Sequence, residues 1–114
     1  MSEVYLAEIR LFAWARPMRG WMACDGSMLP VREHQALFSL LGSRFGGDGK
    51  KTFALPDLRG RHIVGAPPGT TRADHPAATG EYAIAPEDRS RDSGQPFLTL
   101  QYCIATTGNY PPRS

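Results

Sequence analysis

The chain has 114 residues, a length at which one domain is expected, so we treat residues 1–114 as a single domain. Its formal net charge of +2 is too small to indicate binding to nucleic acid or to a membrane surface. No apolar run approaches the roughly 20 residues that span a bilayer, and the first residues lack the basic and continuously apolar parts of a secretory signal. We therefore expect synthesis in the cytoplasm without a signal peptide. The 12 glycines and 10 prolines favour many turns and short strands.

Two strands are predicted in the first 24 residues. Residues 4–14 alternate in polarity with a period of two, and Glu8 and Arg10 fall on the face opposite the apolar positions 5, 7, 9 and 11. Residues 20–24 form a short second strand. Asp25-Gly26 then predicts a turn, because glycine tolerates a positive φ and aspartate bonds to nearby backbone. Residues 28–29 resume an extended segment before Pro30.

Residues 32–41 carry the only helix signal. Leu37, Phe38 and Leu41 gather on one face, which predicts that they belong to the core. Gly42 is suited to end the helix with a positive φ. The start has no capping side chain, so the helix should depend on packing of its apolar face. The sequence therefore predicts a mainly β fold with one short α-helix and long loops.

Residues 43–51 form a glycine-rich loop that does not match a nucleotide site. A phosphate-binding loop would need glycine at position 44 and serine or threonine at position 51, where the chain has Arg44 and Lys51. A dinucleotide fingerprint would need a third glycine where Thr52 stands. No cofactor is predicted.

The segment 53–61 contains Asp57 and Arg59, which share a face of an extended chain and could pair locally. Residues 62–64 read as a short strand ended by Gly65. Residues 66–95 are polar and rich in proline and glycine, and they read as a long surface loop. Residues 97–105 are apolar enough to form a central last strand.

Two cysteines, Cys24 and Cys103, lie far apart in sequence. A disulfide would close a long loop, but two buried thiols in neighbouring strands are the favoured interpretation. Side chains with catalytic chemistry are few and lack a nucleophile signature, and two cysteines without nearby histidines do not make a zinc site. The candidates are Cys24, Asp25, His34, His62 and His75, and we predict no catalytic residue and no metal site among them.

Several contiguous motifs carry a family resemblance. They are EIRLFA at 8–13, GW at 20–21, CDG at 24–26, LP at 29–30, ALFSLLG at 36–42, FGGDG at 45–49, TFALPDLRGR at 52–61 and PFLTLQYCIA at 96–105, with PPR at 111–113. In these the chain resembles the phage tail collar domain and, more narrowly, the microcystin-dependent proteins that carry it. The residues that we assign to the structural motif are Trp21, Cys24, Asp25, Gly26, Leu37, Phe38, Gly46, Gly47, Asp48, Gly49, Phe53, Pro56, Asp57, Arg59 and Gly60.

The resemblance implies a structural or adaptor subunit of a phage tail, a tail-like or a filamentous extracellular assembly, and not an enzyme. Its expected partners are copies of the chain or related collar subunits, most simply as a trimer, together with tail or fibre proteins. A receptor- or glycan-binding module at a fibre tip is the alternative, because Trp14, Trp21 and Tyr82 could stack on sugar rings.

The chain departs from the family pattern in two places. Arg32 stands where family members usually carry a serine-type cap. Residues 66–95, with the single histidine His75, are shorter than the segment that builds a tip and a metal site in some fibre relatives. We therefore expect the chain to keep the collar and to lack the tip.

Overall fold

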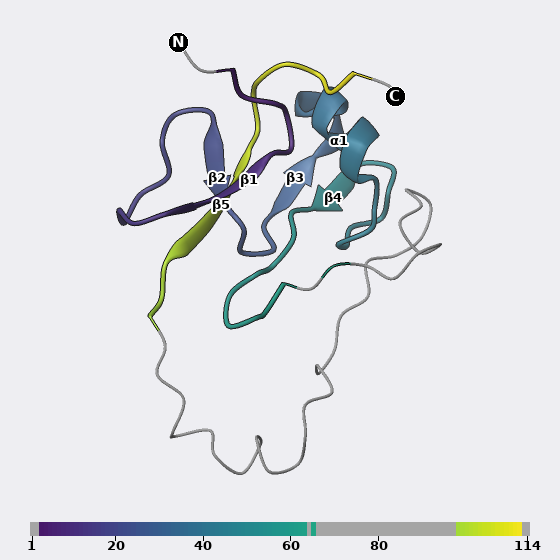
Figure 1. Ribbon diagram of the computed structural model, residues 1–114. Helices are drawn as coiled ribbons and strands as arrows, with labels where there is room; N and C mark the ends of the chain where they lie inside the picture. Colours follow the sequence, from purple (N-terminus) through teal and green to yellow (C-terminus); the bar gives the residue numbers. More distant parts are fainter. Residues whose placement is uncertain (1–2, 64, 66–97, 113–114) are drawn as a thin grey trace.

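The computed structural model describes residues 3–63, 65 and 98–112, which form two small sheets and one short helix (Figure 1). The elements follow in the order β1 (Ile9–Phe12), β2 (Trp21–Ala23), β3 (Met28–Pro30), the 3-10 turn η1 (Val31–Glu33), α1 (Gln35–Leu41), β4 (Thr52–Ala54) and β5 (Gln101–Ala105). The prediction of a mainly β fold with one short helix is confirmed. No helix in the described ranges is long and apolar enough to cross a membrane.

The first sheet has the order β1-β5-β2, with both outer strands antiparallel to β5. The last strand is therefore central, as predicted, although it begins at Gln101 and not at residue 97. The reason is the length of its partner, because β1 ends at Phe12 opposite Gln101 and no strand among the described residues pairs with residues 98–100. In the second sheet β3 pairs antiparallel with β4.

The first strand is much shorter than the predicted 4–14, because a bulge interrupts it at Ala7. Ala105 bonds to two consecutive residues, accepting from the Ala7 N–H and donating to the Glu8 carbonyl. Ala7 has a φ of 72°, a conformation that non-glycine residues rarely adopt. A bulge reverses the faces of the alternating side chains. Leu6 and Phe12 are thus both buried, but in different clusters.

The main core lies between the first sheet, the second sheet and α1. Its buried members are Leu6, Cys24, Leu29, Leu37, Leu41, Phe53, Leu55 and Ile104. Leu37 and Leu41 are buried, as predicted, whereas Phe38 is half-buried and packs on Phe53 with ring centroids 5.4 Å apart. The helix therefore contributes one narrow apolar face.

The helical segment starts differently from the predicted 32–41. The residues after Pro30 form the 3-10 turn η1, and α1 begins only after His34, whose φ of −138° breaks the helical path. Neither start has a side-chain cap, which agrees with the predicted weak N-terminus. Gly42 ends α1 with a φ of 57° and donates its N–H to the carbonyl of Phe38.

The opposite face of the first sheet carries a second, smaller cluster of Phe12, Trp21, Cys103 and Ala105, with Val4 packed against it. Cys24 belongs to the main core and Cys103 to this cluster, so the thiols lie on opposite faces of the sheet. Both are free and buried, and the Cys24 N–H bonds to the carbonyl of Tyr102 on β5. The prediction of two buried free thiols is confirmed, with Cys103 in β5 and Cys24 one residue after the end of the neighbouring strand β2.

The strand predicted over residues 62–64 is wrong for His62 and Ile63, which lie exposed and outside any strand. Val64 lies outside the described residues. So do the predicted long loop at 66–95 and the side chains of His75 and Tyr82.

Candidate functional site

The turn at Asp25-Gly26 is held by bonds to two segments. The Asp25 carboxylate accepts the backbone N–H of Ser27 at 3.0 Å and also the Ser27 hydroxyl. Gly26 has a φ of 81° and donates its N–H to the carbonyl of Pro56 at 3.3 Å. A Cβ at Gly26 would lie 3.3 Å from the Cβ of Asp57. The CDG and PDLRG motifs, 30 residues apart in the chain, therefore form one backbone junction.

Asp57 and Arg59 form the local pair that their spacing predicts. The guanidinium donates from Nε to Oδ1 at 2.9 Å and from Nη2 to Oδ2 at 3.0 Å, a bidentate arrangement. The Arg59 side chain and backbone bonds lower the pKa of Asp57 to about 2. Next to it, the Leu58 N–H bonds to the carbonyl of Cys24 at 2.9 Å, so this pair lies on the same junction.

The glycine-rich loop uses its acid to hold its own backbone. The Asp48 carboxylate accepts the N–H groups of Lys50, Lys51 and Thr52 at 2.8, 2.9 and 3.0 Å. These bonds, of which the one from Thr52 has the largest effect, lower the pKa of Asp48 to about 2. The backbone N–H groups that such a loop would offer to an anionic ligand are therefore already bonded to Asp48.

Gly46 and Gly47 bring this loop against β4. The Gly46 carbonyl accepts the N–H of Ala54 at 3.0 Å. A Cβ at Gly47 would lie 2.5 Å from the Cα of Phe53 and 2.7 Å from the carbonyl oxygen of Thr52. Only glycine allows this approach, which makes the loop a third backbone layer beside the two-stranded sheet.

Trp21 is a core residue and not an exposed stacking surface, which corrects one of the three aromatic candidates. It is buried, with its ring edge-to-face against Phe12 at 5.1 Å. The guanidinium of Arg10 lies 5.5 Å from the Trp21 ring centroid and pairs with Glu8. The hydrogen bond from Arg10 is the main reason that the pKa of Glu8 is lowered. Trp14 is exposed, in agreement with the prediction.

The four catalytic candidates that the structure describes, Cys24, Asp25, His34 and His62, do not form a catalytic cluster, and His75 lies outside the described residues. Burial raises the pKa of the Cys24 thiol to about 12, so it is not a nucleophile at neutral pH. Asp25 is engaged by Ser27, His34 faces the Phe53 ring at 6.5 Å, and His62 is exposed on a separate segment. Among the described residues, no group of three or more metal-ligating side chains occurs.

Two features of the ends of the chain are absent from the sequence reasoning. The backbone of Asn109 exchanges hydrogen bonds with Val4 and Leu6, and a Cβ at Gly108 would lie 2.5 Å from the Val4 carbonyl oxygen. The Tyr110 hydroxyl lies 2.7 Å from that of Ser39 on α1. The Gly108-Asn109 pair is a turn signal that could have indicated the first of these contacts.

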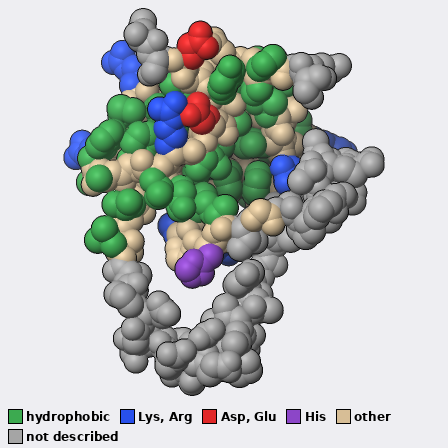
Figure 2. Space-filling model, viewed as in Figure 1, with side chains coloured by type: hydrophobic (Ala, Val, Ile, Leu, Met, Phe, Trp, Pro, Cys, Tyr) green, Lys and Arg blue, Asp and Glu red, His purple; other side chains and the backbone are tan. Residues whose placement is uncertain are grey.

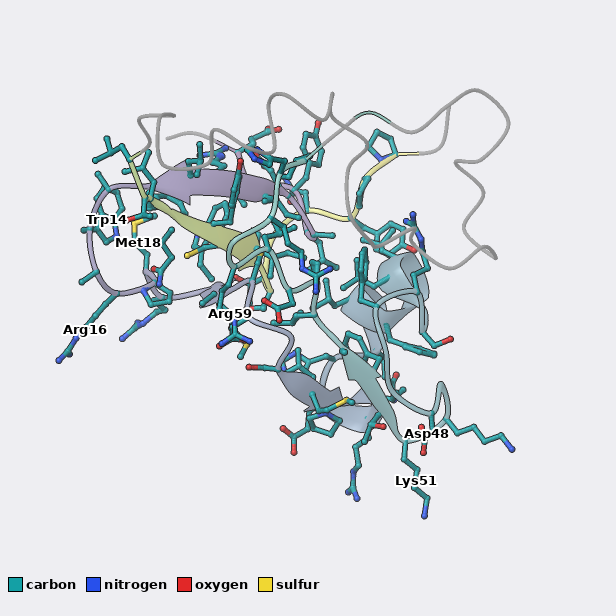
Figure 3. The ribbon with its side chains drawn as sticks, turned by 90° about the horizontal axis from the view of Figure 1, so that it is seen from below. Trp14, Arg16, Met18, Asp48, Lys51 and Arg59 are labelled. Carbon is teal, nitrogen blue, oxygen red and sulfur yellow. The ribbon has the colours of Figure 1, made fainter. Side chains whose placement is uncertain are left out.

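The loop between β1 and β2 is a third feature that was not predicted from the sequence. Figure 3 shows Trp14, Arg16 and Met18 together on it, with Arg16 pointing away from the protein, whereas Asp48 and Lys51 lie on the loop before β4. All three loop side chains are exposed. The sequence signal for this surface is that residues 9–24 contain three arginines, at positions 10, 16 and 19, and no acidic residue.

These observations define a small structural β domain whose motifs hold backbone segments together. Residues 7–63, half of the chain, match the family model described as Phage Tail Collar Domain, and the chain therefore belongs to that family. Searches of the curated proteins and of the solved structures found no match. The family is structural and is not known for catalysis, so membership indicates a structural role in the tail fibre of a virion.

The matched region does not include the strand that completes the fold. β5 (Gln101–Ala105) lies after it and separates β1 from β2 in the sheet. The carbonyls of Tyr102 and Ala105 accept N–H groups of Cys24 and Ala7, both of which lie within the matched region. The collar motif and the C-terminal strand therefore form one structural unit.

Proposed function

We propose that this chain is a structural subunit that joins parts of a phage tail or tail-like assembly, packing with two copies of itself or of related collar chains as a trimer. It would act as an adaptor or attachment collar in the virion or in an extracellular tail-like or filamentous structure. Its motif residues hold the fold and leave its surface for neighbouring subunits.

The observation that carries this proposal is an apolar stripe beside the unpaired edge of β1. Ile9 and Leu11 are 39% and 49% exposed, and Leu98 and Leu100 are 85% and 47% exposed. Since Leu11 pairs with Tyr102, a chain that stayed extended before β5 would present Leu100 on the same face. Figure 2 shows hydrophobic side chains spread across this part of the molecule.

An edge strand with exposed apolar side chains can pair with another chain, and a neighbouring subunit that covers it would prevent aggregation at this edge. In the described residues, the outer side of β1 pairs with no strand. A chain of 12.5 kDa also buries a modest core by itself, so association would add the apolar burial that a small domain lacks.

Native mass spectrometry of the full chain at micromolar concentration tests the proposal. We expect a species of three chain masses, and we expect Leu11→Glu to shift it to the monomer. Met28→Glu is the matched control, because Met28 is exposed on β3 in the other sheet. A compact monomer with no larger species would contradict the trimer.

A second candidate function, binding of a receptor glycan, is favoured by one observation. Trp14 is 51% exposed and stands beside the exposed Arg16. An exposed indole offers a flat apolar face to the C–H groups of a sugar ring, and it keeps a polar N–H for a hydroxyl.

A further inference from the structure

We propose that the loop between β1 and β2, residues 13–20, binds an acidic oligosaccharide, with Trp14 as the stacking platform and Arg16 and Arg19 as the anion-binding groups. This proposal rests on the second candidate function above and is independent of the trimer. It names the ligand class and the place on the fold.

The Trp14 ring packs against buried aromatic side chains. Its centroid lies 5.0 Å from that of Phe12, which in turn lies 5.1 Å from Trp21. Phe12 and Trp21 are buried in the second cluster, so they hold their positions and limit the motion of Trp14. A platform that is ordered before binding loses less entropy when a ligand stacks on it.

A surface hollow lies on the side of the first sheet that carries the second cluster. It is lined by Glu3, Val4, Arg19, Trp21, Thr107 and Asn109. Val4 and Trp21, which line the hollow, also belong to the cluster that supports Trp14, so the hollow and the platform share this cluster. Its carboxylate, amide, hydroxyl and guanidinium groups offer both donors and acceptors, as sugar hydroxyls require.

The charges of the loop favour an acidic ligand. Residues 9–24 contain Arg10, Arg16 and Arg19 but no Asp or Glu. Arg10 is engaged by Glu8, whereas no ion pair involves Arg16 or Arg19 within the described part of the chain. A guanidinium binds carboxylate, sulfate or phosphate groups through paired hydrogen bonds, so these groups on a sugar share the chemistry that the loop can recognise.

Length distinguishes an oligosaccharide from a single sugar. Trp14 does not line the hollow, whereas Trp21 does, and the Phe12 ring contacts both at centroid distances of 5.0 and 5.1 Å. A ligand that contacts both must therefore extend over more than one sugar ring, with an acidic group near Arg16 or Arg19. Figure 3 shows that Arg16 projects beyond Trp14, where it could reach such a group without moving the platform.

The test is calorimetric titration of the full chain with three probes of matched length. Oligogalacturonate supplies carboxylates, a heparin-derived oligosaccharide supplies sulfates, and a dextran oligomer is neutral. We expect at least one acidic probe to bind at least tenfold more tightly than dextran. Trp14→Ala should weaken that binding about tenfold or more, and Arg16→Gln should weaken it several-fold.

The controls separate this site from general attraction between charges. Lys51→Gln removes an exposed cation from a different loop and should leave binding unchanged. Trp14→Phe should retain most of the affinity, which also guards against misfolding of the alanine variant. A single-stranded DNA oligomer that binds as tightly as the acidic sugars would overturn the proposal, because it would show recognition of polyanions alone.

The outcomes also distinguish the proposal from the function on which it rests. Undiminished binding of acidic sugars by Trp14→Ala and Arg16→Gln would overturn this location and leave glycan binding standing. Preferential binding of dextran would overturn the ligand class alone. If none of the three probes binds, both this proposal and the glycan-binding function fail, while the trimer is still decided by its own mass measurement.

Discussion

The CDG, FGGDG and PDLRG motifs bond their charged side chains within the fold, whereas the loop between β1 and β2 carries arginines that pair with no described acid. In these motifs, the carboxylates of Asp25, Asp48 and Asp57 accept hydrogen bonds from nearby backbone N–H groups. In the loop, Arg16 and Arg19 form no ion pair with any described residue. A polar group that already holds the fold has little capacity left for a ligand, so the most recognisable motifs are unsuited to binding.

The comparison also separates two uses of arginine. Arg59 forms two hydrogen bonds to Asp57. Arg10 pairs with Glu8 and also lies over the Trp21 ring. Arg16 forms no ion pair with any described residue and points away from the protein in Figure 3. If this contrast is correct, substitutions in the junction should change stability, and substitutions in the loop should change binding.

The largest effect is expected at Gly47. Gly47→Ala would place a Cβ 2.5 Å from the Cα of Phe53, against backbone that cannot rotate away. We expect a loss of about 3 kcal/mol or more in the free energy of unfolding, at the upper end for single substitutions. Urea denaturation followed by circular dichroism measures it.

Gly60→Ala is the matched control for that variant. Gly60 has a similar positive φ of 67°, but a Cβ there would meet no atom within 4 Å. Gly60→Ala should lower the free energy of unfolding only by the cost of a left-handed backbone conformation, about 1–2 kcal/mol. Equal losses at the two positions would mean that the close packing of the glycine loop on β4 does not stabilise the fold.

The next effect is expected on the buried face of α1. Leu37 is 1% exposed, and Leu37→Ala should lower the free energy of unfolding by about 2–5 kcal/mol because it leaves a cavity in the main core. Met28→Ala shortens a side chain of similar size that is 59% exposed and lies outside the proposed interface, so it should change little. A melting temperature of Leu37→Ala within a degree or two of the parent protein would refute the core position of this helix.

A smaller effect should appear in acid. The pKa values of Asp48 and Asp57 are lowered from 3.8 to about 2, so each carboxylate stabilises the fold above about pH 4. That contribution should be lost as the pH falls from about 4 to about 2. Asp48→Asn and Asp57→Asn should each reduce the slope of stability against pH in this window, measured by urea midpoints.

Glu33→Gln is the control for the acid series, because Glu33 is exposed and no hydrogen bond to its side chain occurs within the described residues. An unchanged acid profile in both aspartate variants would mean that their hydrogen bonds do not persist in solution.

The smallest effect concerns the thiols, where we expect no reaction. Burial raises the pKa of Cys24 to about 12 and raises that of Cys103 as well. A thiol reagent at pH 8 should therefore modify neither cysteine in the folded chain and both in urea. Rapid modification of the folded chain, or a disulfide formed on mild oxidation, would contradict their placement on opposite faces of the sheet.

Local physical chemistry made much of this fold predictable. The positive φ at Gly26 and Gly42 follows from turns that other residues resist. The buried face of α1 follows from helical periodicity, and the Asp57–Arg59 pair follows from a spacing of two in an extended chain. Each of these depends on residues that are neighbours in sequence, so the sequence by itself determined them.

Contacts between distant segments were decided by the tertiary structure alone. The bulge at Ala7 arises because Ala105 bonds to two consecutive residues, and no local signal marks it. It reverses the side-chain faces, so simple alternation misplaced the buried positions of the first strand. The length of β5 depends on where β1 ends, and the burial of Trp21 depends on Phe12 and Arg10. Strand register joins residues about 90 positions apart, and side-chain pattern within one segment does not encode that pairing.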